Sequence, residues 1–181
     1  SSLKKQNLDY VVSVQYDKIL KANLINTPKE KCLNLHFSPL PKLRGCYPTK
    51  WAIIEENHSG VTFHEIDEGI DTGHLLDQKT TKLSARETDQ TLYLRLSKIA
   101  NDLFASNLRN LKARCFPEKR PQLEKDATYH PKKLPFDGQL DWNNSVDFCD
   151  RLLRAFTFPP FPPASCVVGN KRLGLFNPIK K

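Results

Sequence analysis

The sequence contains no methionine, only seven glycines against thirteen prolines, and no run of eighteen apolar residues. The lack of a long apolar run predicts no transmembrane helix, because a bilayer span needs about 20 consecutive apolar residues. The first residues, SSLKKQNLDY, lack the apolar segment of a signal peptide. Because no methionine stands at position 1, we expect a chain that has been processed or truncated.

Disulfide frameworks and zinc sites are also unexpected. The five cysteines are an odd set without CxxC spacing: Cys32, Cys46, Cys115, Cys149 and Cys166. Such a set is typical of reduced thiols, so we expect a cytoplasmic protein without a metal ion.

The chain has few acidic residues for its number of basic ones. Twenty Asp and Glu stand against 28 Lys and Arg, which gives a net charge of +8. This balance favours anionic partners such as nucleic acid, phosphorylated small molecules or a membrane surface. The basic residues are spread along the chain, without the aromatic interleaving of RNA-binding segments. A solvated basic surface and a phosphate-binding role both remain open.

The 181 residues, of which 39% are apolar, suffice for one domain with or without a small appendage. Residues 9–14 and 31–37 are apolar runs typical of strands. Residues 19–30 lie between them and predict a helix or turn that closes at Pro28. Two strands joined by a helical crossover indicate a βαβ unit with a parallel sheet.

The middle of the chain alternates between expected helices and strands. Residues 47–56 predict a helix, and 60–66 and 74–80 predict strands joined by a turn. Ser84 and Glu87 form a capping-box pattern. The helix that they would open carries an apolar stripe down to about Arg114, formed by Leu92, Leu96, Ile99, Leu103 and Leu111.

The last third is richer in proline. Residues 116–136 are polar and predict a connector on the surface. Residues 145–156 predict a short helix, and 158–164 are too rich in proline for a regular element. Two apolar runs around Gly169-Asn170 predict a hairpin over 165–178.

Three polar residues suggest chemistry. Asn34 and His36 are two apart at the carboxyl end of an expected strand, so their side chains share a side. In open α/β sheets this end holds the ligand. A histidine can accept a proton there, an amide can donate to an oxyanion, and Asp71 could stabilise the charged imidazole. The spacing alone also fits a purely structural histidine.

Four ordered motifs then carry a resemblance. The strings NLHFSPLPKLRG (34–45), WAI (51–53), GVTFH (60–64) and DTG (71–73) resemble the folate-dependent formyltransferase family. The likeness covers about residues 9–80. Within the family, it is closest to the nucleotide-sugar N-formyltransferases.

The resemblance implies an α/β, Rossmann-like fold whose opening βα units are missing from this chain. It divides the chain into the later part of a formyltransferase catalytic domain (1–115), a connector (116–136) and a small β-containing extension (137–181) with a helix and a hairpin. It also implies a homodimer.

The resemblance further implies that an amine attacks the formyl carbon of 10-formyltetrahydrofolate. A tetrahedral intermediate then releases tetrahydrofolate. On this basis His36 assists the transfer of the amine proton, Asn34 donates to the oxyanion, and Asp71 holds His36.

The loop after the first strand occupies the family's pterin-pocket position, which implies that Gln15, Tyr16 and Asp17 contact the folate. Lys18 is unusual there and would meet a substrate phosphate or carboxylate, unless it is a surface lysine. For His64 we expect a packed, hydrogen-bonded role.

The carboxyl-terminal strings DGQLDW (137–142) and RLLRAFTFPPFPP (151–163) resemble the nucleotide-sugar members. Aromatic rings there could stack on a base, and guanidinium groups could pair with a diphosphate. Core or dimer packing is the alternative for the aromatic rings. The substrate-binding candidates, besides Lys18, are Arg44, Arg151, Arg154, Phe158 and Phe161.

These observations predict formyl transfer to a dTDP-linked amino-deoxysugar such as dTDP-4-amino-4,6-dideoxyglucose, in surface polysaccharide or O-antigen biosynthesis. Neither a membrane nor a nucleic acid is an expected partner. Two alternatives remain open: a methionyl-tRNA formyltransferase, for which tRNA would be the partner, and a catalytically incomplete fragment or binding module.

Overall fold

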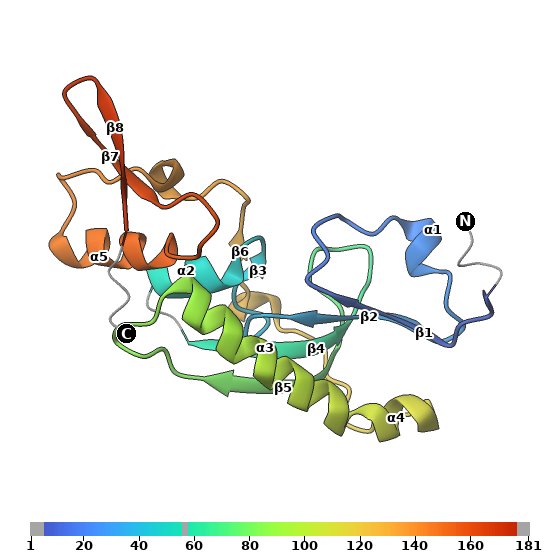
Figure 1. Ribbon diagram of the computed structural model, residues 1–181. Coiled ribbons are helices and arrows are strands. Elements are labelled where there is room, and N and C mark those ends of the chain that lie inside the picture. The colour runs from blue at the N-terminus through green and yellow to red at the C-terminus, as the bar shows by residue number, and fades with distance from the viewer. Residues whose placement is uncertain (1–5, 56–57, 177–181) are drawn as a thin grey trace.

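A computed structural model describes residues 6–55 and 58–176. Strands β1 (Tyr10–Val14) and β2 (Lys31–His36) lie side by side and parallel, joined by the single-turn helix α1 (Ala22–Ile25). The predicted βαβ unit is confirmed (Figure 1). A parallel pair of this kind brings both carboxyl ends to one edge of the sheet.

The other half of the sheet is antiparallel. Strand β4 (Ser59–Glu65) pairs with β2, and β5 (Leu75–Thr81) pairs with β4, which gives the order β1-β2-β4-β5. The chain between β2 and β4 carries the predicted helix, α2 (Pro48–Ile54). The resulting mixed sheet with flanking helices belongs to the α/β, Rossmann-like class that the sequence predicted.

Helix α3 (Asp89–Ser106) lies across the sheet (Figure 1). Its Leu92 and Leu96 side chains are fully buried. The predicted capping box is misplaced, because the helix begins four residues later and Thr88 caps it together with Thr91. Glu87 accepts a hydrogen bond from the Ser84 amide, as predicted, but its carboxylate is also bound by the guanidinium of Arg95. This ion pair fixes the segment before the helix.

The single long helix expected down to Arg114 is interrupted. Asn107 caps α3, and a separate helix α4 (Leu108–Ala113) follows. The Asn107 amide donates to Asp77 of β5 at 2.6 Å and to the carbonyl of Leu103 at 2.9 Å. A side chain that bonds to the backbone in this way competes with helical hydrogen bonds.

The expected surface connector is tied into the domain. Strands β3 (Arg44–Gly45) and β6 (Tyr129–His130) form a short parallel pair. Upstream of β6, the backbone of Arg120 exchanges two hydrogen bonds with that of Leu75. One short 3-10 turn, η2 (Glu124–Asp126), precedes β6, and a second, η3 (Pro135–Gly138), follows it.

The carboxyl-terminal part packs on α2. Helix α5 (Val146–Ala155) buries Leu152 and Ala155, and strands β7 (Ala164–Val168) and β8 (Lys171–Leu175) form a projecting hairpin (Figure 1). The predicted helix and hairpin are confirmed, although positions 177–178 lie outside the described residues. The division into 1–115, 116–136 and 137–181 stays a prediction. Within the described ranges, no helix is long and apolar enough to cross a membrane.

Candidate active site at the carboxyl edge of β1 and β2

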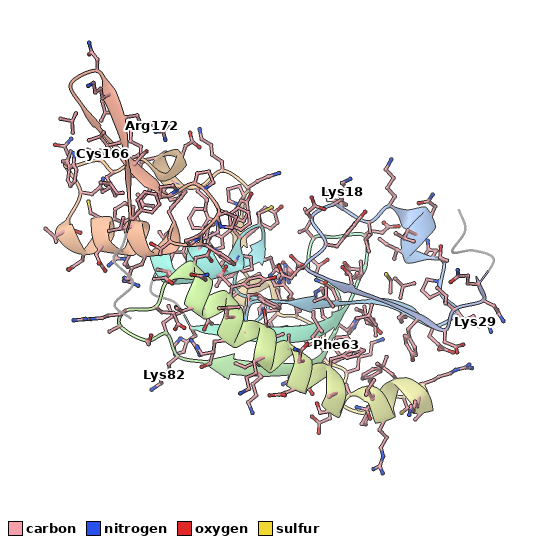
Figure 2. All side chains as sticks on the ribbon, viewed as in Figure 1. Lys18, Lys29, Phe63, Lys82, Cys166 and Arg172 are labelled. Atoms are coloured by element: carbon pink, nitrogen blue, oxygen red, sulfur yellow. The ribbon has the colours of Figure 1, made fainter. Side chains whose placement is uncertain are left out.

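A cavity of about 500 Å³ opens where β1 and β2 end. Its walls come from the loop after β1, the end of β2, the start of α2 and the loop between β4 and β5. Figure 2 shows Lys18 on the first of these loops. Asn34, His36 and Asp71 all line the cavity, so the structure brings the predicted trio together.

Strand geometry explains the meeting of Asn34 and His36. Side chains two apart on a strand point to the same face of the sheet. On the neighbouring strand His64 stands directly opposite Asn34, and it also lines the cavity. The site therefore contains a fourth polar side chain.

The hydrogen bonds of His36 fix its tautomer. Its Nε2 lies 2.9 Å from the carbonyl oxygen of Leu43, which can only accept, so Nε2 carries the hydrogen. In the neutral ring Nδ1 then holds the lone pair. Nδ1 lies 3.6 Å from Oδ1 of Asp71. His36 can thus accept a proton at Nδ1, and the carboxylate stabilises the resulting imidazolium.

Asp71 is held in a fixed position. Its backbone is left-handed, with φ of 56°, a conformation that Asp tolerates better than most residues. The amide of Gly45 donates to Oδ2 at 2.9 Å, while Oδ1 faces both His36 and His64 at 3.6 Å.

The glycine of the DTG motif is required by packing. A Cβ at position 73 would lie 2.0 Å from the carbonyl oxygen of Glu65. Only glycine lets the loop that carries Asp71 approach β4 this closely.

His64 is buried, and its own tautomer is also determined. Its Nδ1 donates to the carbonyl of Glu65 at 2.7 Å, which leaves Nε2 as an acceptor for the Asn34 amide at 3.2 Å. Burial lowers the pKa of His64 to about 4, although the nearby Asp71 acts in the opposite direction. His64 is therefore neutral at physiological pH, as this hydrogen bond requires.

The bond to His64 orients the Asn34 side chain. Because Nε2 accepts, the atom beside it must be the amide nitrogen rather than the amide oxygen. One Nδ2 hydrogen is used in this way, and the described residues provide no acceptor for the other. That second hydrogen can serve a ligand in the cavity. The expectation of a packed, hydrogen-bonded His64 is confirmed, but its contact with Asn34 was not predicted.

Half of the eight described non-glycine residues with positive φ lie around the cavity. Four non-glycine residues adopt positive φ values on its walls or in its supports: Gln15, Leu43, Tyr47 and Asp71, between 51° and 59°. Such conformations each cost about 1–3 kcal/mol and cluster at functional sites.

The predicted folate contacts Gln15, Tyr16 and Asp17 line the cavity, as does Lys18. The five other substrate-binding candidates do not line it.

Arg44 is 4% exposed, and its guanidinium is bound by Gln122 and Glu124. The hydrogen bond from Arg44 lowers the pKa of the Glu124 carboxyl. Arg44 thus supports the fold around the site.

The two arginines of α5 tie that helix to the rest of the molecule. Arg151 Nε donates to the carbonyl of Ile54 at 2.9 Å. Arg154 donates to the side chain of Asp150 and the carbonyl of Glu87. Both guanidinium groups are therefore bound within the protein, and their pairing with a substrate diphosphate stays a prediction.

The two phenylalanines also lie elsewhere. Phe158 packs against Tyr93 of α3, with ring centroids 5.4 Å apart, and Phe161 packs edge-on against Phe158. The rings pack on one another and on α3, but Phe161 stays 61% exposed, so stacking on a base remains a prediction.

The cavity residues that the sequence analysis missed include two tyrosines and a lysine. Tyr47 follows the RG of the longest motif, whereas Tyr129 and Lys132 belong to the connector. Both tyrosines are substantially exposed, at 40% and 54%. No local pattern marks Tyr129 or Lys132, because only the pairing of β6 with β3 brings them to the site.

A histidine, an amide and a carboxylate line one cavity at the carboxyl edge of a Rossmann-like sheet, a set of groups suited to acyl-type group transfer. The comparisons with known proteins agree. Residues 1–108 match the formyl transferase family, so this chain belongs to that family.

Relatives point to two kinds of formyltransferase. The chain is 35% identical over 176 residues to a methionyl-tRNA formyltransferase of Lachnospira eligens, which covers 97% of this chain and 55% of that protein. A 4-N formyltransferase from Francisella tularensis shares the fold, with a TM-score of 0.83 at 22% identity over 96% of this chain and 72% of the other. An N-formyltransferase from Helicobacter canadensis, in complex with folinic acid and dTDP-3-aminofucose, gives a TM-score of 0.76 at 26% identity, covering 88% and 58%.

The chain spans about half the length of the curated methionyl-tRNA formyltransferases it matches. Among the described residues, no group of three His, Cys, Asp or Glu side chains could hold a metal ion.

Proposed function

We propose that this chain transfers a formyl group from 10-formyltetrahydrofolate to a primary amine. The observation that carries the proposal is the placement of Asn34, His36 and Asp71 around one cavity, with His36 Nδ1 3.6 Å from the Asp71 carboxylate. A neutral amine nucleophile needs a proton acceptor, and an oxygen that gains negative charge needs a donor. The trio provides both.

The cavity suits a reduced folate. Its apolar side chains, Ile19, Leu20, Leu35, Ile66 and Ile70, can cover the faces of a bicyclic ring. Gln15 and Asp17 can bind the polar edge of the ring, and the volume of about 500 Å³ is typical of sites for small ligands. When bound, the folate supplies an activated formyl group.

The residues then divide the work by chemistry. His36 takes a proton at Nδ1, and Asp71 stabilises the charge that appears on the ring. Asn34 offers its second amide hydrogen to the oxygen that becomes negative. Since Asn34, His36 and Asp71 are all held by hydrogen bonds or ion pairs within the protein, little reorganisation is needed during the reaction.

For the acceptor we propose a nucleotide-linked amino sugar, with dTDP as the nucleotide. Lys18 and Lys132 line the cavity and can pair with a diphosphate. Tyr47 and Tyr129 line it too and offer exposed ring faces to a base. The presence of dTDP-3-aminofucose in the Helicobacter canadensis relative supports this choice.

Methionyl-tRNA is the second candidate. The methionyl-tRNA formyltransferase of Lachnospira eligens is more similar in sequence, at 35% identity, than the amino-sugar enzymes of known structure described above. A net charge of +8 is also favourable for a polyanion.

One assay separates the candidates. The protein is incubated with 10-formyltetrahydrofolate and either a panel of dTDP-amino sugars or methionyl-tRNA, and mass spectrometry scores the gain of one formyl group. Asn34→Ala, His36→Ala and Asp71→Asn serve as slow controls, each expected to lose about 100- to 1000-fold in rate while keeping a measurable residual rate. If only methionyl-tRNA gains the formyl group, and the affinity for it falls steeply as the salt concentration rises, then methionyl-tRNA is the acceptor and the amino-sugar proposal is wrong. Folate binding without transfer to either acceptor would support a catalytically incomplete fragment or a binding module.

We also propose a homodimer. The hairpin β7–β8 and its flank expose apolar side chains, including Val168 at 60% and Phe176 at 73%. Apolar patches of this kind often mark protein–protein contacts. Light scattering of the protein and of a Val168→Lys variant tests the proposal, since a dimer through this hairpin would dissociate in the variant.

A further inference from the structure

The connector reaches the loop that carries Asp71 through one side chain. The Nε2 amide of Gln122 donates to the carbonyl of Asp71 at 2.8 Å and to the carbonyl of Gly73 at 2.7 Å. Gln122 lies 51 residues from Asp71 in sequence. Both amide hydrogens are therefore used on the two ends of the DTG motif.

The other end of the same amide is held as firmly. Oε1 of Gln122 accepts from Arg44 Nε at 3.1 Å and from Nη2 at 2.9 Å. Arg44 is buried and also donates to both carboxylate oxygens of Glu124. Because the guanidinium can only donate, Gln122 must present Oε1 to it and Nε2 to the loop. The amide cannot flip without losing all four bonds.

The four hydrogen bonds of Gln122 form a clamp between Arg44 and the DTG loop. This clamp supports the backbone at Asp71, which would otherwise relax. Asp71 is left-handed, and its carboxylate must stay near His36 Nδ1 while Oδ2 accepts from Gly45. The backbone bonds between Arg120 and Leu75 bring the connector alongside this loop, but they do not reach Asp71. Gln122 is the connector side chain that does.

We infer that Gln122 is a positioning residue for Asp71. By fixing both carbonyls of the DTG loop, it sets the distance between the Asp71 carboxylate and His36. Arg44 and Glu124 act through Gln122, which gives Arg44 an indirect part in the reaction in place of contact with substrate. The inference rests on the proposed function, in which Asp71 stabilises the charged ring of His36.

The sharpest variant is Gln122→Glu, which keeps an oxygen for Arg44 and replaces the two donors by an acceptor facing two carbonyls. Gln122→Met removes the donors without adding charge. Gln139→Glu is the matched control for the charge change, because Gln139 is exposed and lies in the chain between the connector and α5. We expect kcat to fall about 10- to 100-fold in both Gln122 variants, since small misplacements of catalytic groups have costs of this size. The KM values for both substrates should change less than threefold, and Gln139→Glu should match the wild type.

A double-mutant cycle tests whether the effect passes through Asp71. In an Asp71→Asn background, Gln122→Met should cost less than threefold, because the carboxylate that it positions is already gone. An equal loss in both backgrounds, or unchanged kcat in both Gln122 variants, would overturn the inference.

Amide hydrogen exchange provides a readout that does not depend on turnover. Residues 69–74 should exchange faster in the Gln122 variants and at the wild-type rate in Gln139→Glu. Faster exchange in a protein that formylates no acceptor would mean that the clamp exists and that the proposed function is wrong. If residues 69–74 exchange at the wild-type rate in the Gln122 variants and the wild type is an active formyltransferase, the clamp is rejected and the proposed function stands.

Discussion

The amide nitrogen of Asn34 lies 3.2 Å from Nε2 of His64, directly across two antiparallel strands. His64 can accept this hydrogen bond only while it is neutral, and its burial keeps it so. The pair therefore links a buried histidine to the side chain that we propose as the donor to the oxyanion.

Substitution of His64 should lower turnover through Asn34. His64→Leu removes the acceptor and frees the amide to rotate, so we expect kcat to fall by about 10- to 100-fold. His64→Gln can present an oxygen where Nε2 stands and should recover most of the rate. The exposed His58 lies outside the cavity, and His58→Leu is the matched control. Equal losses in the Leu and Gln variants would show that His64 acts by packing alone.

His64 should also make stability depend on pH. Its pKa is about 4 in the folded protein against 6.5 in the unfolded chain, so the unfolded chain binds the extra proton between these values. Stability is therefore retained above pH 6.5 and lost as the pH falls toward 4.

The shift of the His64 pKa from 6.5 to about 4 corresponds to a loss of roughly 3 kcal/mol in the free energy of unfolding. Urea unfolding of the wild type and of His64→Gln at pH 7 and pH 4.5 measures it. The variant should lose clearly less stability than the wild type over this interval. Parallel losses in the two proteins would assign the acid sensitivity to other groups.

Gly73→Ala should disable the site by moving the loop that carries Asp71. The new methyl carbon would lie 2.0 Å from the carbonyl oxygen of Glu65, so the loop must shift. We expect a loss in kcat of at least about 100-fold, measured by single-turnover formylation. Gly169→Ala is the control, because its Cβ would meet nothing within 4 Å, although Gly169, unlike Gly73, has a left-handed φ of 61°. The control should lose about 1 kcal/mol of stability and keep its rate.

Replacement of the cavity residues from the connector should weaken acceptor binding. If Tyr129 stacks on a base and Lys132 pairs with a diphosphate, Tyr129→Ala and Lys132→Ala should each raise the KM for the acceptor about tenfold, with the KM for the folate unchanged. Phe161→Ala is the control from outside the cavity. If Phe161→Ala raises the KM for the acceptor more than Tyr129→Ala and Lys132→Ala do, the acceptor binds at the proline-rich segment and not at the cavity.

The sequence was informative where function depends on neighbours within one strand or one turn. The two-residue spacing of Asn34 and His36 placed both side chains on one face of β2, and hydrophobic patterns located β1, β2, β4, β5, α5 and the final hairpin. The start of α3 was less well predicted, because Thr88 caps the helix in place of Ser84. The carboxylate of Glu87 is held by Arg95, which lies eight residues further along the chain. Asn107 interrupts the helix through a contact with β5 that no helical pattern reveals.

The sequence by itself determined the βαβ unit, the candidate trio of Asn34, His36 and Asp71 and the family resemblance, because strand periodicity and contiguous motifs are local properties of the chain. The tertiary structure alone decided the partners of those residues. It paired Asn34 with His64 across two strands, placed the guanidinium of Arg44 on Gln122, and brought Tyr129 and Lys132 to the cavity. Such contacts join residues tens of positions apart, and their formation depends on strand register and chain reversal, which single-residue preferences do not encode.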